Sequence, residues 1–457
     1  MNTAATRLVA LLLALSTFAA VCPARPTRAR ANLNRRALAA RVRAEFLHAW
    51  RGYERYAWGH DELKPLTKTH RDWYEEPLLM TPVDSLDTMI LMGLDAEAAK
   101  TRKLILDQLS FDKDIYVQNF EITIRHLGGL ITAYQLTGER RFLILAEDLG
   151  TRLLPAFESK TGLPYRFVNL KTGKVRGEVT NPAEAGTLLL EFGALSKLTR
   201  RPVFYDRAKR ALVETYKRRS RIGLVGGNIN VETGEWTDAE SHLSGGIDSY
   251  YEYLLKCWLL FGDRDCRRMW LEGVAAVNKY LADEVGGALW YGYADMHTGR
   301  RTQEYFGALD AFFPAVLALS GDTRRARRLQ ASAFRMWRLH GIEPERLNYR
   351  TMQVESAAYP LRPEIIESAY YLHRLTGDPE YLRMGAEMFE DFVRHCRTEA
   401  GYAALKSVVT KEKSDGMQSF LFAETLKYFY LLFAPDGRVN LRTAVFNTEA
   451  HPIRKTW

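Results

Sequence analysis

The chain repeats one local pattern along most of its length: an apolar run with helical spacing, a short turn, and a second helical run. In residues 364–374, for example, Ile365, Ala369 and Leu372 fall on one face, as in a helix that buries one side. From the second turn onward the turns lie about 60 residues apart, which leaves room for two helices of about 15 residues and their loops. The pattern therefore predicts seven helical hairpins, with turns at residues 93–95, 137–139, 199–201, 261–263, 320–322, 376–378 and 434–437.

Seven consecutive hairpins favour a toroid, in which the first helix of each hairpin faces the centre and the second wraps the outside. An open solenoid would have the same periodicity, so that alternative stays open at this point. Strand-like alternation is short and local, in residues 165–170 and 223–231, and it predicts β-hairpins on long loops. The fold class is therefore all-α, with minor β-structure on the loops.

Residues 1–31 have the pattern of an export signal peptide. Arg7 gives a positive start, residues 8–15 form an apolar core, and a small-residue site follows at Ala29-Arg30-Ala31. The apolar core is too short for a permanent membrane helix, and no later apolar run is long enough for one. We therefore expect a soluble protein in the periplasm or outside the cell, whose residues 32–457 form one catalytic domain.

The formal net charge of +9 includes four arginines in residues 1–31, without which +5 remains. The other basic residues are scattered, so we interpret them as a solvated surface rather than a nucleic-acid site, and we expect a monomer. Outside the signal peptide the cysteines are Cys257, Cys266 and Cys396, so at least one has no partner within the chain. Cys257 and Cys266 flank a predicted turn and could pair, although the sequence alone also allows free thiols.

Four acidic residues stand at similar places in different hairpins, each 13 to 17 residues before the turn: Glu121, Glu184, Asp248 and Glu364. Matched offsets would place these side chains at the same level of the same end of a barrel. For any single acid, an alternative is helix capping, because a carboxylate in the first turn favours the helix dipole. The set as a whole favours a site in which carboxylates from distant parts of the chain meet.

Paired carboxylates are what glycoside hydrolysis needs. One carboxyl group donates a proton to the leaving oxygen, and the other, ionised, activates water or attacks the sugar. Other chemistries are poorly served, because the sequence contains no G-x-S-x-G elbow, phosphate-binding glycine loop or His-x-x-x-His metal pair. His60, His126 and His451 are isolated in the sequence, which is more typical of structural histidines.

An ordered series of motifs from about residue 49 to residue 451 resembles glycoside hydrolase family 47, the class I α-mannosidases. Each motif alone is weak, but their order along nearly the whole chain is specific. The motifs are AWRGY at 49–53, GHDELKP at 59–65, VDSLDT at 83–88, Phe120-Glu121 with Arg125, Ala183-Glu184 with Gly186-Thr187, DSYYEYL at 248–254, LRPE at 361–364 with Glu367-Ser368, Ser419-Phe420 with AETLK at 423–427, and FNTEAH at 446–451.

The resemblance implies an (α/α)7 barrel and exo-acting hydrolysis of α-1,2-linked mannose with inversion, by a bacterial secreted member of the family. The substrate would be a manno-oligosaccharide or a high-mannose glycan. Glu121 matches the general acid, which is thought to act through water. Glu364 matches the proposed general base, and Asp248 matches a third essential carboxylate, which is either the base or a residue that positions water.

The resemblance also implies calcium as cofactor. The carbonyl and hydroxyl of Thr448 match the only direct protein ligands, and waters and two sugar hydroxyls complete the shell, as a hard cation prefers. Phe420 would pack beneath the terminal mannose, and we expect Arg362 to help keep Glu364 ionised. The remaining matched residues would bind sugar hydroxyls, calcium waters or one another: Arg125, Glu184, Arg362, Glu367, Glu424 and Glu449.

Three positions depart from the pattern of many family members. Gly246 stands where an arginine is common, and Ala308 and Ala311 stand where a histidine and a cysteine are common. Residues 308–314 are more similar to the branch of the family linked to glycoprotein degradation. These changes leave the matched acid and bases intact and affect the subsites beyond the terminal mannose. The altered subsites motivate a second hypothesis, a mannose-binding module with little or no catalysis. A third hypothesis is another helical-toroid hydrolase or lyase that acts on a different sugar.

Overall fold

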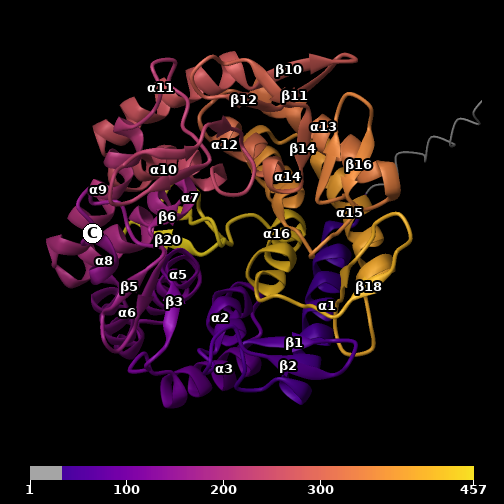
Figure 1. Ribbon diagram of the computed structural model, residues 1–457. Helices are drawn as coiled ribbons and strands as arrows, with labels where there is room; N and C mark the ends of the chain where they lie inside the picture. The colour runs from indigo at the N-terminus through magenta and orange to yellow at the C-terminus, as the bar shows by residue number, and fades with distance from the viewer. Residues whose placement is uncertain (1–32) are drawn as a thin grey trace, which may run out of the picture. The chain divides into compact units, whose positions relative to one another are not determined.

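Helices that face the centre of a ring alternate along the chain with helices that wrap its outside, in the computed structural model of the protein (Figure 1). The structure describes residues 33–457, of which Asn34–Trp457 form one unit. The predicted signal peptide at residues 1–31 lies outside the described residues. Within the described part of the chain, no helix is long and apolar enough to cross a membrane.

Six helical hairpins follow one another as predicted. Their inner and outer helices are α2 (Met80–Met92) and α3 (Asp95–Gln108), α5 (Gly128–Thr137) and α6 (Arg140–Leu153), α8 (Leu189–Thr199) and α9 (Pro202–Lys217), α10 (Asp248–Phe261) and α11 (Arg264–Tyr280), α12 (Phe313–Leu319) and α13 (Thr323–His340), and α14 (Glu364–Thr376) and α15 (Glu380–Cys396). Gly138 ends α5 in the left-handed conformation that glycine adopts without strain. Arg200 takes the same conformation after α8, at a φ of 59°, so the turn geometry is kept without glycine.

The seventh hairpin is built differently from the prediction. Helix α16 (Leu426–Phe433) ends before Pro435, which cannot continue a helix, and within the described residues no second helix follows it. Helix α1 (Arg35–Tyr56), from the other end of the chain, packs against α16 instead (Figure 1). The predicted turn at 434–437 therefore joins no hairpin, and the pairing of α1 with α16 closes the ring as an (α/α)7 barrel.

Burial follows the two roles of the helices. Every residue from Leu189 to Ser196 of the inner helix α8 is buried, because its neighbours cover it on all sides. The outer helix α13 buries one stripe at helical spacing, which includes Ala326, Leu329 and Ala333, and exposes its basic face. One continuous hydrophobic core therefore runs between the two layers.

The loops carry short strands that form eight antiparallel sheets of two or three strands. The predicted strand segments at 165–170 and 223–231 contain β4 and β7, each paired with the strand that follows it. The sheets are β1 (Glu62–Lys64) with β2 (Thr69–Arg71); β3 (Tyr116–Gln118), β4 (Phe167–Asn169) and β5 (Val175–Arg176); β6 (Val179–Thr180), β7 (Asn228–Asn230) and β8 (Trp236–Asp238); β9 (Glu240–Ser241), β12 (Tyr293–Asp295) and β13 (Arg301–Gln303); β10 (Ala282–Val285) with β11 (Ala288–Tyr291); β14 (Tyr305–Gly307), β15 (Arg346–Asn348) and β16 (Gln353–Ser356); β17 (Ala404–Leu405) with β18 (Lys413–Ser414); and β19 (Ala444–Phe446) with β20 (Pro452–Arg454).

Two features of this framework prepare the functional site. The β19–β20 hairpin packs against the inner helices α5, α8 and α10, so its tip, residues 447–451, lies within the ring. Short helical turns also interrupt or precede several inner helices. These are α4 (Asn119–Ile122), α7 (Pro182–Gly186), the 3-10 turn η3 (Leu309–Phe312), and the π turns η1 (Thr123–Leu127) and η4 (Leu421–Thr425). A second 3-10 turn, η2 (Leu154–Phe157), follows the outer helix α6.

Candidate active site

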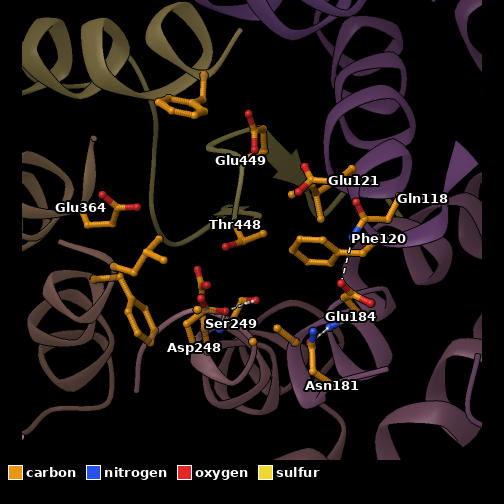
Figure 2. A pocket seen from close by; sticks show the side chains of 18 of the residues that line it. Gln118, Phe120, Glu121, Asn181, Glu184, Asp248, Ser249, Glu364, Thr448 and Glu449 are labelled. Carbon is orange, nitrogen blue, oxygen red and sulfur yellow. Dashed lines mark hydrogen bonds between the residues drawn. The ribbon is translucent and has the colours of Figure 1, made fainter. Parts of the chain in front are cut away.

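A cavity of about 760 Å³ lies at one end of the inner helices, and all eleven predicted site residues line it (Figure 2). They come from six separate segments of the chain, which the closed ring brings together. The eleven residues are Glu121, Arg125, Glu184, Asp248, Arg362, Glu364, Glu367, Phe420, Glu424, Thr448 and Glu449.

The matched offsets of the four acids have a structural cause. Asp248 and Glu364 are the first residues of α10 and α14. Glu121 and Glu184 lie in α4 and α7, the short helices that precede α5 and α8. The side chain of Asn181 caps α7 by accepting a hydrogen bond from the Glu184 amide, at 2.9 Å. All four acids thus stand where the chain enters an inner helix, at one end of the barrel.

Arg125 connects the candidate acid to two other carboxylates. Its Nε donates to Glu121 Oε2 at 2.9 Å, and its Nη1 donates to Asp84 Oδ2 at 3.3 Å and to Glu449. The guanidinium also lies over the ring of Phe420, 5.8 Å from its centroid. Arg125 belongs to the π turn η1, a helical irregularity that is frequent at functional sites. The arginine therefore fixes the orientation of Glu121 within the pocket wall.

Acids greatly outnumber bases in the pocket wall, because nine carboxylates line it against three arginines. Burial raises the pKa of Glu364 and of Glu367 to about 8 in each case. Burial also raises the pKa of Glu424 and of Glu449 well above the usual value. The pocket therefore favours added positive charge. The acids are Glu121, Glu184, Asp238, Asp248, Glu252, Glu364, Glu367, Glu424 and Glu449, and the arginines are Arg125, Arg166 and Arg362.

Arg362 lowers the pKa of Glu364, as the sequence suggested, but its hydrogen bonds go to another carboxylate. Its Nε donates to Glu345 Oε2 at 3.0 Å, and its Nη2 contacts the other oxygen of the same carboxylate. Burial of Glu364 outweighs the attraction of Arg362, so the pKa of Glu364 rises rather than falls. Arg362 therefore acts on Glu364 in the expected direction, but in the protein by itself its charge is too weak to offset burial. Glu364 Oε2 is buried without a hydrogen-bond partner among the described residues.

Asp248 is held by its neighbour. The amide and the hydroxyl of Ser249 both donate to Asp248 Oδ1, at 2.6 and 3.0 Å. Burial outweighs these bonds and raises the pKa of Asp248 to about 6. In Figure 2, Asp248 and Glu364 lie across the pocket from Glu121. This arrangement allows a proton donor and a proton acceptor to act from different sides of one sugar.

The opposite wall contains polar residues that the motifs did not single out. Gln118 Nε2 donates to Glu184 Oε1 at 2.8 Å, and Arg166 Nη2 lies 3.0 Å from the same oxygen. Glu252 also lines the pocket and forms a fully buried ion pair with Lys256. Lys256 was detectable in the sequence, because a lysine within an apolar inner helix needs a buried acid. Nothing in the sequence marked Gln118 or Arg166.

Thr448 projects into the middle of the pocket from the hairpin tip (Figure 2). Its amide donates to Tyr253 Oη at 3.3 Å. Its carbonyl and hydroxyl oxygens make no hydrogen bond within the part of the chain that the structure describes. Two free oxygens in a strongly acidic pocket suit a hard divalent cation that also keeps water ligands. The donor set at Thr448 therefore fits the implied calcium.

Comparison with known proteins agrees with this geometry. The family model described as glycosyl hydrolase family 47 matches residues 45–455. The chain belongs to glycosyl hydrolase family 47. It is 39% identical to Alpha-mannosidase I MNS5 of Arabidopsis thaliana over 443 residues, which cover 91% of this chain and 76% of that relative.

Two further similarities place the chain within family 47. It is 36% identical over 448 residues to ER degradation-enhancing alpha-mannosidase-like protein 2 of Mus musculus, covering 90% of this chain and 77% of that relative. Its structure is similar to that of the alpha-1,2-mannosidase from Trichoderma reesei, with a TM-score of 0.84 and 28% identity. That match covers 92% of this chain and 99% of the Trichoderma chain. The protein is thus a glycosidase with the (α/α)7 barrel.

Proposed function

We propose that this family 47 protein is a calcium-dependent, inverting exo-α-1,2-mannosidase that removes terminal α-mannose from manno-oligosaccharides or high-mannose glycans. The observation that carries the proposal is the convergence of Glu121, Asp248, Glu364 and Thr448 in one acidic pocket of sugar size. The names of the relatives, which are α-mannosidases, support the same reaction class.

The two sides of the pocket have complementary tasks in this reaction. Glu121, oriented by Arg125, supplies a proton to the leaving oxygen, directly or through a water. Glu364 or Asp248 accepts a proton from the water that attacks the anomeric carbon from the other side. A water between base and sugar requires well-separated carboxylates, and the placement of Glu121 across the pocket from both candidates supports inversion.

Calcium would be held by the Thr448 carbonyl and hydroxyl, with waters that Glu364, Glu367, Glu424 and Glu449 can bind. When bound, it would supply positive charge that orients vicinal hydroxyls and stabilises the transition state. The same charge would lower the raised pKa of Glu364, because a bound cation inverts the effect of burial. Glu364 would then be ionised at neutral pH, as a general base must be.

Exo action has structural support in the position of the β19–β20 hairpin. Its tip lies within the ring against three inner helices, at the bottom of the pocket that Thr448 lines. A polysaccharide could not thread past this hairpin. The terminal sugar of a chain could enter the pocket from the open end, with Phe420 packing against it.

Export of the protein is part of the proposal. Cys257 and Cys266 form a disulfide between α10 and α11, and Cys396 is buried and free. Structural disulfides persist in oxidising compartments such as the periplasm or the cell exterior, which supports those locations. The expectations of a bacterial source and of a monomer stay predictions.

A chelation experiment tests the calcium-dependent activity. We expect chelation to abolish mannose release from α-1,2-mannobiose, and added calcium to restore it. Thr448→Val keeps the carbonyl but loses the hydroxyl, so it should require more calcium for the same rate. Thr456→Val, at an exposed threonine of the same terminal segment, serves as the control. Full activity after exhaustive chelation would refute the metal requirement.

A catalytically weak mannose-binding module is the alternative. It is favoured by Gly246, which lines the pocket and leaves room where a larger side chain would face Asn181. Measurable mannobiose binding with intact substrate after long incubation in calcium would support this alternative against the hydrolase.

A further inference from the structure

His451 lies at the end of the hairpin tip, and two acids of α2 hold it from both sides. Its Nε2 is 3.1 Å from Asp84 Oδ1, and its Nδ1 is 3.0 Å from Asp87 Oδ2. All three side chains are fully buried. Burial alone would lower the pKa of His451, but Asp87 and Asp84 outweigh it and raise the pKa. The imidazole therefore donates from both nitrogens and is neither a metal ligand nor an isolated histidine.

The backbone next to His451 adopts a conformation that needs support. Ala450 has a φ of 58°, in the left-handed region that residues with a side chain rarely occupy. Lys427 Nζ, which is fully buried, donates to the Ala450 carbonyl at 2.6 Å and to Asp87 Oδ2 at 3.0 Å. The buried charges thus hold the tip in a conformation that it would not adopt freely.

Helix α5 makes room for the tip by beginning with two glycines. A Cβ on Gly128 would lie 2.6 Å from Asn447 Nδ2 and 3.1 Å from His451 Cδ2, and a Cβ on Gly129 would lie 3.3 Å from His451 Cε1. Gly128 has ordinary right-handed helical angles, so its backbone does not require glycine. The close approach of the tip therefore requires glycine at position 128, whereas at Gly129 Val83 of α2, 3.0 Å away, is closer than the tip.

The same contacts lead directly to the pocket. Asn447 Oδ1 accepts hydrogen bonds from the amides of His451 and Glu449, at 2.7 and 3.1 Å. Asp84, which holds His451, also accepts a hydrogen bond from Arg125, the partner of Glu121 and Glu449. The position of Thr448 between these anchored residues is therefore set by groups outside the pocket.

We propose that His451 is a positioning residue: held between Asp84 and Asp87, it fixes the hairpin tip so that the oxygens of Thr448 and Glu449 face the pocket in binding geometry. The inference rests on the proposed function in taking calcium and mannose as the ligands. We call His451 with Asp84 and Asp87 the histidine clamp. Loss of this clamp would weaken the binding of calcium and of mannose without removing any group that touches them.

Three variants of the full chain test the proposal. His451→Gln removes one of the two donors, and Gly128→Ala pushes on Asn447 and His451 from α5. Gly273→Ala is the control in another helix. Gly273 lies in the outer helix α11, and its Cβ would lie 3.3 Å from Tyr251 of α10 and meet no residue of the tip. An alanine in place of a helical glycine favours the helix, so a loss in Gly128→Ala would come from the contact with the tip.

Calcium chloride is titrated calorimetrically into each chelator-treated protein, and mannobiose turnover is then measured in saturating calcium. We expect the Kd for calcium to rise about tenfold or more in His451→Gln and Gly128→Ala and to stay unchanged in Gly273→Ala, with kcat largely restored by excess calcium. Melting temperatures identify the temperature at which all variants are folded, where the titrations are made. Unchanged calcium Kd in Gly128→Ala would overturn the inference, even where His451→Gln fails to fold.

The design separates the inference from the proposed function. If the wild type binds no calcium, the proposed calcium dependence fails. The inference is then decided by the Kd for mannose in the same proteins. Weaker mannose binding in Gly128→Ala than in Gly273→Ala would support the clamp, and equal binding would overturn it.

Discussion

Replacement of Glu121 by glutamine tests the role of the candidate acid. The glutamine side chain has nearly the same shape as the native one, and its carbonyl oxygen can still accept the 2.9 Å hydrogen bond from Arg125 Nε. Arg125 also keeps Asp84 and Glu449 as partners. The free energy of unfolding should therefore change by only about 1 kcal/mol, the usual net worth of one hydrogen bond.

The expected loss of activity is much larger than the loss of stability. A positioned general acid contributes roughly 10²–10⁴ to the rate, or about 3–5 kcal/mol of transition-state stabilisation. Turnover of α-1,2-mannobiose should fall by that factor, because its leaving oxygen needs a proton. Hydrolysis of α-mannosyl fluoride should fall less than about tenfold, because fluoride leaves without protonation.

The assay compares kcat on both substrates for the wild type, Glu121→Gln and Glu184→Gln. Glu184 is the matched control, since it is another pocket glutamate with close polar partners, Gln118 and Arg166. Glu184→Gln should raise KM and should leave the ratio of kcat on mannobiose to kcat on the fluoride as in the wild type. Equal losses on mannobiose and on the fluoride in Glu121→Gln would refute the assignment of Glu121 as acid, and so would near-normal turnover of mannobiose.

Three further predictions follow from the pocket and the barrel. Glu364→Gln should lose most turnover on both mannobiose and mannosyl fluoride, because neither substrate replaces the base. Initial rates on the two substrates would measure this loss. In calcium-free protein, the melting temperature should fall as pH rises from about 4.5 to about 8. The reason is that the fold stabilises Glu364 and Glu367 in the protonated form, and both ionise over this range. A melting temperature that calorimetry finds independent of pH would contradict this prediction. Cys257→Ala should lower the free energy of unfolding by roughly 2–3 kcal/mol, since the disulfide closes a loop with a separation of 9 residues, as denaturant titration would show.

Local signals predicted much of the fold. Gly138 and Gly377 stand at helix ends because only a left-handed residue turns the chain there, and this requirement is visible in the sequence. The prediction of a helical hairpin at residues 434–437 was wrong, because turn residues do not reveal whether a helix follows. The pairing of α1 with α16 joins the two ends of the described chain, and such long-range contacts leave no local signal.

In the site, too, features with a local sequence signal were predictable and long-range contacts were not. Asp248 and Glu364, at the starts of their helices, were predictable, because each lies at a similar distance before its turn. The net rise in the pKa of Glu364 was not, because sequence proximity to Arg362 says nothing of burial or of the competing partner Glu345. His451 was predicted to be a structural histidine, but its partners Asp84 and Asp87 were not predictable, since they lie more than 360 residues away in the sequence.

Hydrolysis of α-1,2-linked mannose with inversion can be observed by proton NMR. Purified protein is mixed with α-1,2-mannobiose and calcium, and the anomeric signals are followed from the first minutes, before mutarotation mixes them. We expect β-mannose to be released first, because water attacks from the face opposite the leaving oxygen. Initial release of α-mannose would contradict inversion, and no release from bound mannobiose would contradict hydrolysis itself.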